Sequence, residues 1–404
     1  MRVFRRGGTT RKVTAILILA FVITGCSGCE SYDNFKDTFF NKNGESDKIR
    51  IAVYEPMSGR DSEYAQAEIA GIEMAYSLFP KALDKDVELI YCNNMSDIYA
   101  CDSVVTNLVQ KRPAIVLGSY GSLYSLTASD ELAANKIPAI AITNTNPLVT
   151  SNNEYYFRVC YLDSFEGVAI AKFLHDTAPN EKVAILREVD DDYALTVTKV
   201  FRDKMFSLSG DSSILTATVE YRKDQKDFKE ELKKIKKSGA KFVVLAGDSD
   251  DVANILRSAN ALNPGLRFFA TSRIKDAKHL LDDVGEEAAE ELLFSSPYDP
   301  KKGLTGMSRV FANEYRKIYG KDAVPKNETV LGFDSYILAI DAINRAKTAS
   351  NGEKIRKALA STREFQGAGG AITFDKQGDP IKSMLIMQVQ EGKIVTVYKM
   401  QPDL

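Results

Sequence analysis

The sequence has few of the residues on which metal and nucleophilic chemistry depend. Its two histidines, His175 and His279, do not stand at metal-ligand spacings from cysteine or carboxylate residues. The 53 basic residues are balanced by 55 acidic ones, for a net charge of -2, which leaves no basic excess to bind nucleic acid. The chain also has no nucleophile elbow, dinucleotide-binding glycine motif or phosphate-binding loop. We therefore expect a protein without metal, cofactor, nucleic acid or catalytic activity.

Cysteine is also scarce, with five residues in a chain of 404. Two of them, Cys26 and Cys29, lie close to the N-terminus. Cys92 and Cys101 could form a short-loop disulfide in an oxidising compartment, but the sequence does not show whether their Cα atoms come within about 7 Å, so this bond stays open. Cys160 lies in a strand-like run and is interpreted as a small buried hydrophobic residue.

The apolar segment near the N-terminus is too short to span a bilayer. Residues 13–23 form an apolar run of 11 residues, whereas a membrane-spanning helix needs about 20. The run follows a basic head that includes Arg5 and Arg6. This arrangement predicts an export signal over residues 1–25, and therefore a protein that works outside the cytoplasm.

The signal ends in Ile23-Thr24-Gly25-Cys26, which resembles a bacterial lipobox. The resemblance implies that Cys26 receives a diacylglyceryl group, becomes the first residue of the mature chain and anchors it to the bilayer. Each acyl methylene that enters the membrane adds about 0.8 kcal/mol of affinity. An ordinary cleaved signal, or lipidation at Cys29, is the alternative. Residues 26–48 are then expected to form a polar, lipidated tether. Which bacterial membrane carries the anchor stays open.

The remaining part of the chain, of roughly 355 residues, is longer than one hydrophobic core usually supports, which favours two lobes. Short β-branched runs alternate with amphipathic segments along it, a pattern typical of mainly parallel sheets covered by helices on both faces. Strands are expected at 49–54, 87–91, 114–117, 139–142, 183–186, 242–246 and 268–271, and helices at 64–79, 103–111, 195–207, 227–238, 329–346 and 353–361.

The C-terminal part changes character, because β-type runs follow one another there. Residues 383–390 and 394–398 are separated by Glu391-Gly392-Lys393, which reads as a hairpin turn in which Gly392 can take the positive φ that such turns need. We expect this hairpin to add strands to the edge of an existing sheet.

Two glycine- and hydroxyl-rich turns follow neighbouring strands. Gly118-Ser119-Tyr120-Gly121-Ser122 comes after the strand expected at 114–117, and Thr143-Asn144-Thr145-Asn146-Pro147 comes after that at 139–142. In parallel sheets, small ligands bind at the carboxyl ends of the strands, where helix N-termini present free N–H groups. Together these turns could hold one carboxylate, although each alone could equally be a helix cap.

Several short motifs, taken in order, carry a resemblance to a known family. The chain from Ile49 to Lys399 resembles the extracytoplasmic binding proteins of branched-chain amino acid ABC transporters, which have the periplasmic-binding-protein type I fold. The resemblance implies two α/β lobes with a ligand cleft between them. Besides the segments 118–130 and 137–147, it rests on Met57-Ser58-Gly59, Tyr64, Phe157-Arg158, Asp163, the strand before Tyr193, and Leu256-Arg257-Ser258-Ala259.

In the first lobe, the resemblance implies contacts to a carboxylate and to a ligand side chain. It places the hydroxyl groups of Ser122 and Thr145, and backbone N–H groups near Thr143, on the carboxylate of a bound amino acid. This agrees with the anion-binding turns read from the residues themselves. Tyr64 and Tyr120 match positions that pack on the ligand side chain.

In the second lobe, the resemblance assigns Asp163, Tyr193 and Asp248 to the cleft. Asp248 stands where the family often has tyrosine. The larger departure is at Ser272, where the family pattern has an acidic residue that accepts the ligand ammonium group. The next residue is Arg273.

Two readings of Ser272 remain open. In the favoured one, Asp248 supplies the missing carboxylate from the adjacent strand, because a buried cation needs an opposite charge or hydrogen-bond acceptors. In the other, the ligand lacks an ammonium group, and Arg273 faces solvent or a second anionic group. Asp250 and Asp251 are interpreted as solvated residues of a helix N-terminus.

The resemblance implies an extracytoplasmic binding protein that captures an amino acid or related small carboxylate by hinge closure and delivers it to the subunits of an ABC permease. The alternative is a ligand sensor that hands its closed state to a receptor or regulatory partner. We expect the chain to cross between lobes near 162–163, 294–296 and 383. This places 49–162 and 294–383 in the first lobe, and 163–293 and 384–404 in the second.

Overall fold

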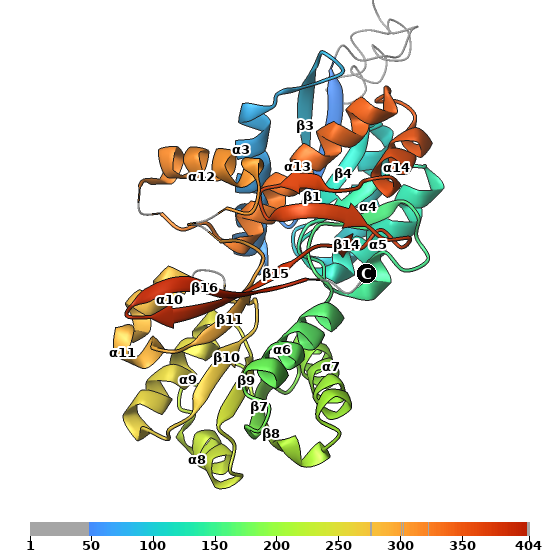
Figure 1. The fold of residues 1–404 in the computed structure, drawn as a ribbon. Helices are drawn as coiled ribbons and strands as arrows, with labels where there is room; N and C mark the ends of the chain where they lie inside the picture. Colours follow the sequence, from blue (N-terminus) through green and yellow to red (C-terminus); the bar gives the residue numbers. More distant parts are fainter. Residues whose placement is uncertain (1–47, 275–276, 300, 302, 322, 402–404) are drawn as a thin grey trace, which may run out of the picture. The chain divides into compact units, whose positions relative to one another are not determined.

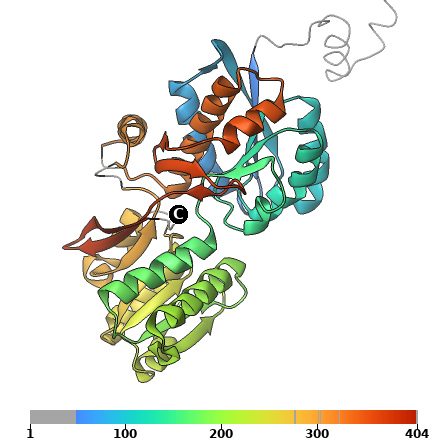
Figure 2. The same cartoon turned by 45° about the vertical axis from the view of Figure 1, so that its right-hand side comes forward.

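The computed structural model describes residues 48–401, apart from 275–276, 300, 302 and 322. The expected signal peptide, Cys26 and the tether up to residue 47 lie outside the described residues. Of the helices in the described part, none combines the length and the apolar character that crossing a membrane requires. Figures 1 and 2 show two α/β lobes, each with a large central sheet and its own helices.

The first lobe is built on a six-stranded sheet in the order β2-β3-β1-β4-β5-β6. All neighbours are parallel except β2 and β3. The apolar runs form buried strands because helices cover both faces: α3, α13 and α14 on one face, and α4 and α5 on the other. The strands are β1 Ile49–Glu55, β2 Lys81–Ala82, β3 Lys85–Asn93, β4 Ile115–Gly118, β5 Ala139–Ala141 and β6 Tyr156–Arg158.

The helices of this lobe come from two distant parts of the chain. The first group precedes residue 160, and the second follows residue 305, so the lobe is discontinuous in sequence. The helices are α3 Ser62–Leu78, α4 Ile98–Gln110, α5 Ser122–Ala134, α12 Gly306–Tyr319, α13 Asn327–Ala346 and α14 Gly352–Ala360. A small antiparallel sheet is formed by β12 Phe365–Gly367, β13 Gly370–Phe374 and β14 Pro380–Ile381.

The second lobe is built on a seven-stranded sheet in the order β16-β15-β11-β10-β9-β7-β8. Helices α6 and α7 cover one face, and the other helices cover the opposite face. The strands are β7 Val183–Glu188, β8 Leu215–Tyr221, β9 Phe242–Ala246, β10 Arg267–Ala270, β11 Leu293–Ser296, β15 Met384–Gln390 and β16 Lys393–Met400. The helices are α6 Asp163–Thr177, α7 Asp192–Ser209, α8 Lys229–Lys237, α9 Ser249–Leu262, α10 Ala277–Val284 and α11 Glu286–Ala289.

The expected C-terminal hairpin is present at the edge of the second sheet (Figure 1). Gln390 pairs with Lys393, so the turn consists of Glu391 and Gly392, with φ angles of 50° and 68°. Two positive φ angles define a type I′ turn, which matches the twist of antiparallel strands. The hairpin adds β15 and then β16 to β11 in antiparallel fashion.

Helices α3 and α13 cross in very close contact, and this contact fixes the position of α3. A Cβ atom added to Gly71 would lie 2.0 Å from the carbonyl oxygen of Thr329, and one added to Gly332 would lie 2.1 Å from that of Glu68. Only glycine therefore allows this approach. The expected α/β fold with two mainly parallel sheets is confirmed. β11 pairs within the second sheet through Ser296, the last residue of the range in which a crossing was expected.

Candidate ligand-binding site

The first expected anion-binding turn lies where the strand order of the first sheet reverses. β1 lies between β3 and β4, so the carboxyl ends of β1 and β4 flank the switch point, where open α/β sheets bind ligands. β4 ends at Gly118, and α5 begins at Ser122 after Gly121, whose φ is 86°. The first N–H groups of α5 have no intrahelical acceptor. This helix end therefore suits a carboxylate.

Tyr64 and Tyr120 form an aromatic wall beside this helix end. Their rings are stacked, with centroids 5.0 Å apart and an interplanar angle of 10°. The backbone N–H of Tyr120 donates to Oε2 of Glu55 at 2.6 Å. This hydrogen bond ties the loop between β4 and α5 to the end of β1. Both expected aromatic residues are thus brought together on the side of Ser122.

Beneath the wall, two buried glutamates contact each other. Glu55 and Glu68 are both fully buried, and their carboxyl groups act on each other's pKa. Burial, together with the neighbouring charge of Glu68, holds the pKa of Glu55 well above its usual value. Burial likewise raises the pKa of Glu68 to about 8. The hydroxyl group of Thr143 donates to Oε1 of Glu68, so this expected ligand residue is hydrogen-bonded within the protein.

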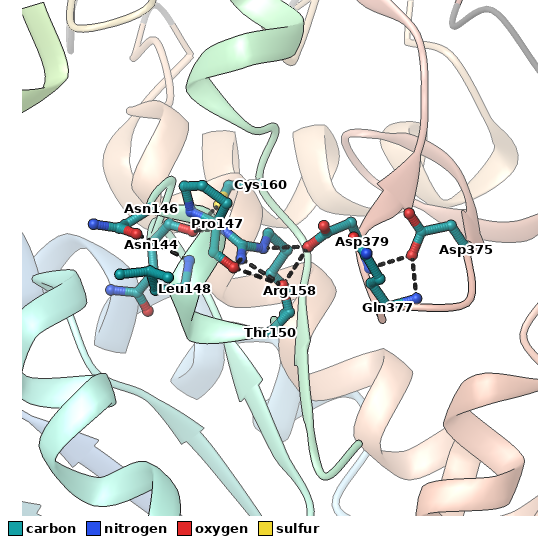
Figure 3. A network of polar contacts seen from close by, with 10 residues as sticks. All are labelled: Asn144, Asn146, Pro147, Leu148, Thr150, Arg158, Cys160, Asp375, Gln377 and Asp379. Atoms are coloured by element: carbon teal, nitrogen blue, oxygen red, sulfur yellow. Dashed lines mark hydrogen bonds and ion pairs between the residues drawn. The ribbon is translucent and has the colours of Figure 1, made fainter. Parts of the chain in front are cut away.

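The second expected turn is held from behind by a buried arginine (Figure 3). Arg158 has no exposed surface. Its Nε atom lies 2.6 Å from Oδ1 of Asp379, Nη1 donates to the carbonyl oxygen of Asn144 at 2.6 Å, and Nη2 donates to Oγ1 of Thr150 at 2.7 Å. Since both ends of the 144–150 loop contact one guanidinium group, the position of Thr145 is fixed.

Thr145 and Asp163 connect the two lobes. Asp163 is the first residue of α6, and the side chain of Thr145 lowers the pKa of its carboxyl group, against the larger effect of burial. Burial raises the pKa of Asp163 to about 7. Among the described residues, no donor lies within hydrogen-bonding distance of its buried Oδ1 atom. Two expected ligand residues from different lobes therefore meet, with one acceptor still unused.

Glu166, one turn further along α6, gathers the polar groups of the second lobe. Glu166 is 3% exposed. Oε1 accepts from the N–H of Ser272 at 2.7 Å and from the hydroxyl group of Ser295. Oε2 accepts from the hydroxyl groups of Tyr193 at 2.6 Å and Ser272 at 3.1 Å. The structure thus brings a carboxylate to Ser272, from a residue that the sequence analysis did not single out.

Arg273 is held beside this cluster. Its Nη1 atom lies 2.6 Å from Oδ2 of Asp191, and its guanidinium carbon lies 4.0 Å from the centroid of the Tyr193 ring. The arginine also interacts electrostatically with Tyr120 of the first lobe. Its charge is therefore paired with Asp191 rather than directed only to solvent.

The structure uses Asp248 as a helix cap. Its Oδ1 atom accepts from the N–H groups of Asp250 and Asp251 at 3.0 and 3.1 Å at the start of α9. Part of the Asp248 carboxylate is therefore already occupied. The interpretation of Asp251 as solvated is wrong, because this residue is 6% exposed and its Oδ2 atom accepts from the hydroxyl group of Tyr221 at 2.9 Å. Cys92 and Cys101 carry free thiol groups, so the bond that the sequence allowed is absent from this structure.

The sequence did not predict the role of three acidic residues whose side chains point into the protein interior. Glu68 follows Ala65 and Ala67 and precedes Ile72 on the buried face of α3, and Glu166 similarly lies on the apolar face of α6. The sequence signal that could have identified them is an acidic residue at a position where the helical periodicity calls for an apolar one. Glu55 ends a strand that is otherwise apolar and buried.

Two lobes with polar groups that face each other across their boundary define a ligand-binding protein of the periplasmic type. The profile of the family described as periplasmic binding protein matches residues 48–393, and the chain belongs to this family. Membership confirms the expectation of a binding protein rather than an enzyme.

The chain is similar to proteins of known name and to proteins of known crystal structure. The chain is 24% identical to the leucine-, isoleucine-, valine-, threonine- and alanine-binding protein of Pseudomonas aeruginosa PAO1 over 382 residues, which cover 91% of this chain and 94% of that protein. The crystal structure of a leucine-binding protein, LivK, from Thermotoga maritima MSB8 is 29% identical with a TM-score of 0.76, covering 88% and 99% of the two chains. A solute-binding protein of an ABC transporter from R. palustris in complex with benzoate shares the fold at 14% identity, with a TM-score of 0.74 and coverage of 88% and 97%.

Proposed function

We propose that this protein captures a small solute that carries a carboxylate group between its two lobes and delivers it to an ABC permease. The meeting of expected ligand residues from both lobes carries this proposal. Thr145 contacts Asp163, and Nδ2 of Asn327 in the first lobe donates to the carbonyl oxygen of Ser272 in the second at 3.3 Å. The N-terminus of α5 and Ser122 would take the carboxylate, and Tyr64 and Tyr120 would pack on the rest of the solute.

The names of similar proteins support a solute of this size and charge. They include proteins named for binding branched-chain amino acids and a protein crystallised with benzoate. Each of these solutes has a carboxylate group and an apolar part. The lobes would comprise 49–162 with 297–383, and 163–296 with 384–404. Helices α13 and α14 of the later segment pack on the first sheet, and the strands of 163–296 and 384–404 pair in one sheet.

A thermal-shift screen with amino acids, their amides, small carboxylates and aromatic acids tests the proposal. A ligand at about 100 times its Kd stabilises the folded protein by about 2.7 kcal/mol. We expect a shift with at least one carboxylate, which Ser122→Ala weakens and Ser103→Ala, on the exposed side of α4, leaves unchanged. If no carboxylate raises the melting temperature, the proposal is wrong.

We further propose that the protein lies outside the cytoplasm and is anchored by acyl chains on Cys26. The lipobox-like sequence before this residue supports the anchor, and the family supports the location. Cys26→Ser should move the protein from the membrane fraction to the soluble fraction, because a chain without acyl groups has no apolar anchor. Cys29→Ser serves as the matched control, and a membrane-bound Cys26→Ser protein would contradict the assignment.

A further inference from the structure

Helix α12 and the turn after it carry an excess of positive charge. Residues 306–321 contain four basic residues, Arg309, Arg316, Lys317 and Lys321, and one acidic residue, Glu314. All four basic residues are exposed, and Lys317 forms an ion pair with Glu314 at 2.9 Å. Because the whole chain has a net charge of -2, this segment differs in sign from the rest of the molecule.

The same helix also exposes apolar side chains. Val310, Ile318 and Tyr319 are 40%, 51% and 49% exposed. The inner face holds α12 in place, since the ring of Phe311 packs on that of Phe333 in α13, with centroids 5.2 Å apart. Figures 1 and 2 show α12 on the outside of the first lobe, away from α4 and α5. Basic and apolar side chains thus lie together on an outer surface.

Two other surfaces have one of these properties each. Helix α8 contains five lysines, but its apolar residues Leu232 and Ile235 are buried. The start of α4 exposes Tyr99, but the exposed charged residues beside it in sequence are Asp97 and Asp102. Of these three surfaces, only that of α12 combines exposed apolar side chains with positive charge.

This combination suits the surface of a membrane that contains anionic lipids. Helices that lie on a bilayer insert apolar side chains between the headgroups, and their Lys and Arg residues attract the anionic ones. A tyrosine such as Tyr319 fits the same depth, because its ring is apolar and its hydroxyl group is polar. The charge and the exposed side chains of α12 are therefore complementary to an anionic phospholipid surface.

The proposed anchor brings such a surface within reach but does not choose the face that meets it. From Cys26 to residue 47 the chain has 22 residues. At no more than about 3.6 Å per residue, this segment spans at most roughly 80 Å. A reach of this order lets different faces of the folded part approach the bilayer, so the exposed side chains decide which face stays there.

We propose that the outer face of α12, together with Lys321, docks on the anionic phospholipid headgroups of the membrane that carries the anchor. The inference rests on the proposed anchor at Cys26 and adds a second contact to it. Because the anchor keeps the protein at a high local concentration near the bilayer, a contact that is weak by itself is sufficient. The contact would orient the first lobe relative to the membrane.

A tryptophan reporter tests this contact, because the chain contains no tryptophan of its own. The mature lipidated Ile318→Trp protein is reconstituted in vesicles of phosphatidylcholine, alone or with phosphatidylglycerol. With phosphatidylglycerol we expect a blue shift of the emission and quenching by brominated lipids, and with phosphatidylcholine alone neither. Tyr99→Trp, at the exposed start of α4, is the matched control and should show neither in both. If Ile318→Trp does not fold, Val310→Trp replaces it.

Charge variants then connect the contact to the basic residues. In the reporter protein, Arg309→Gln and Lys321→Gln should each lower the ratio of docked to undocked protein about fivefold, as expected for one basic residue near an anionic surface. Lys234→Gln, on α8, should leave the ratio unchanged. Raising the salt concentration to about 1 M, where the Debye length is about 3 Å, should release the contact.

The outcomes separate the inference from the anchor on which it rests. Sedimentation with the vesicles measures the anchor, and quenching measures the contact of α12. An anchored protein whose reporter at position 318 is not quenched, or is quenched equally in both lipid mixtures, overturns the inference alone. A blue shift that grows with protein concentration in the absence of vesicles would assign the face to a second copy and also overturn it. If the protein does not sediment with either kind of vesicle, the anchor and the inference both fail.

Discussion

At the scale of single residues, the carboxyl pair under the site is the most unusual chemistry of the described chain. Two buried carboxylates in contact would repel each other strongly, and a shared proton removes that repulsion. Glu55 then holds the N–H of Tyr120, and Glu68 holds the hydroxyl group of Thr143. The pair thus contacts both glycine- and hydroxyl-rich turns, one through each glutamate.

The pair predicts a stability that falls as the pH rises. In the unfolded chain both glutamates ionise near pH 4.3, whereas in the folded protein the pKa of Glu68 is raised to about 8 and that of Glu55 is also raised. Between these values the folded state binds more protons, so stability decreases with increasing pH. The effect is about 1.4 kcal/mol for each unit of pKa shift.

Glu55→Gln should flatten this dependence, because the amide can donate to Glu68 and allow it to ionise at lower pH. Urea unfolding between pH 5 and 9 measures the slope. Asp163 and Asp334, whose pKa values burial raises to about 7 and about 6, act in the same direction in both proteins. Glu63→Gln, at an exposed position of α3, the helix that carries Glu68, is the control. An unchanged slope in Glu55→Gln would show that the pair does not hold the proton.

At the scale of helices and strands, the crossing of α3 and α13 sets the position of the pair. Gly332→Ala would place a methyl group against the carbonyl oxygen of Glu68, and overpacking of this kind costs about 1–3 kcal/mol. We expect a lower melting temperature and weaker solute binding together. Gly306→Ala, at the start of α12 where an added Cβ meets nothing within 4 Å, should be neutral or slightly stabilising. A Gly332→Ala protein as stable as the parent would contradict the tight crossing.

Most elements could be predicted from the sequence because burial on both faces leaves a continuous apolar run. The strand expected at 242–246 is β9, and the helix expected at 227–238 contains α8. β8 was not predicted, because its mixed, half-exposed sequence Leu-Thr-Ala-Thr-Val-Glu-Tyr has no such run.

The polar contacts of the site were harder to predict than its position. The turns at the strand ends were visible, since glycine and hydroxyl residues there are unusual. The carboxyl partners were not, because Glu166 and Ser272 are 106 residues apart and an acidic residue in a helix usually faces water. Only the fold shows which acidic side chains turn inward.

At the scale of the whole described chain, the segments that join the lobes are tied together. The hydroxyl group of Tyr161 donates to the carbonyl oxygen of Ser383 at 2.7 Å, and the buried Nζ of Lys382 donates to that of Val159 at 3.3 Å. Adjacent crossing segments linked in this way can bend together, as a hinge requires.

Hinge closure predicts that the bound protein is more compact than the free protein. Small-angle X-ray scattering should show a smaller radius of gyration once the solute found in the screen saturates the site, because both lobes then contact it. Ser122→Ala at the same solute concentration should change less, since it binds more weakly. A raised melting temperature without any change in radius would contradict closure.

The Arg158 cluster has a consequence for how the chain is made. Thr150 and Asp379, which both contact Arg158, are 229 residues apart, and α13, which covers one face of the first sheet, is also synthesised late. During synthesis the strands β1 to β6 therefore emerge long before the helix that shields them. Such a nascent chain exposes apolar surface, which favours aggregation until the later helices cover it. The order of synthesis thus makes the C-terminal quarter of the chain the step that permits the first lobe to fold.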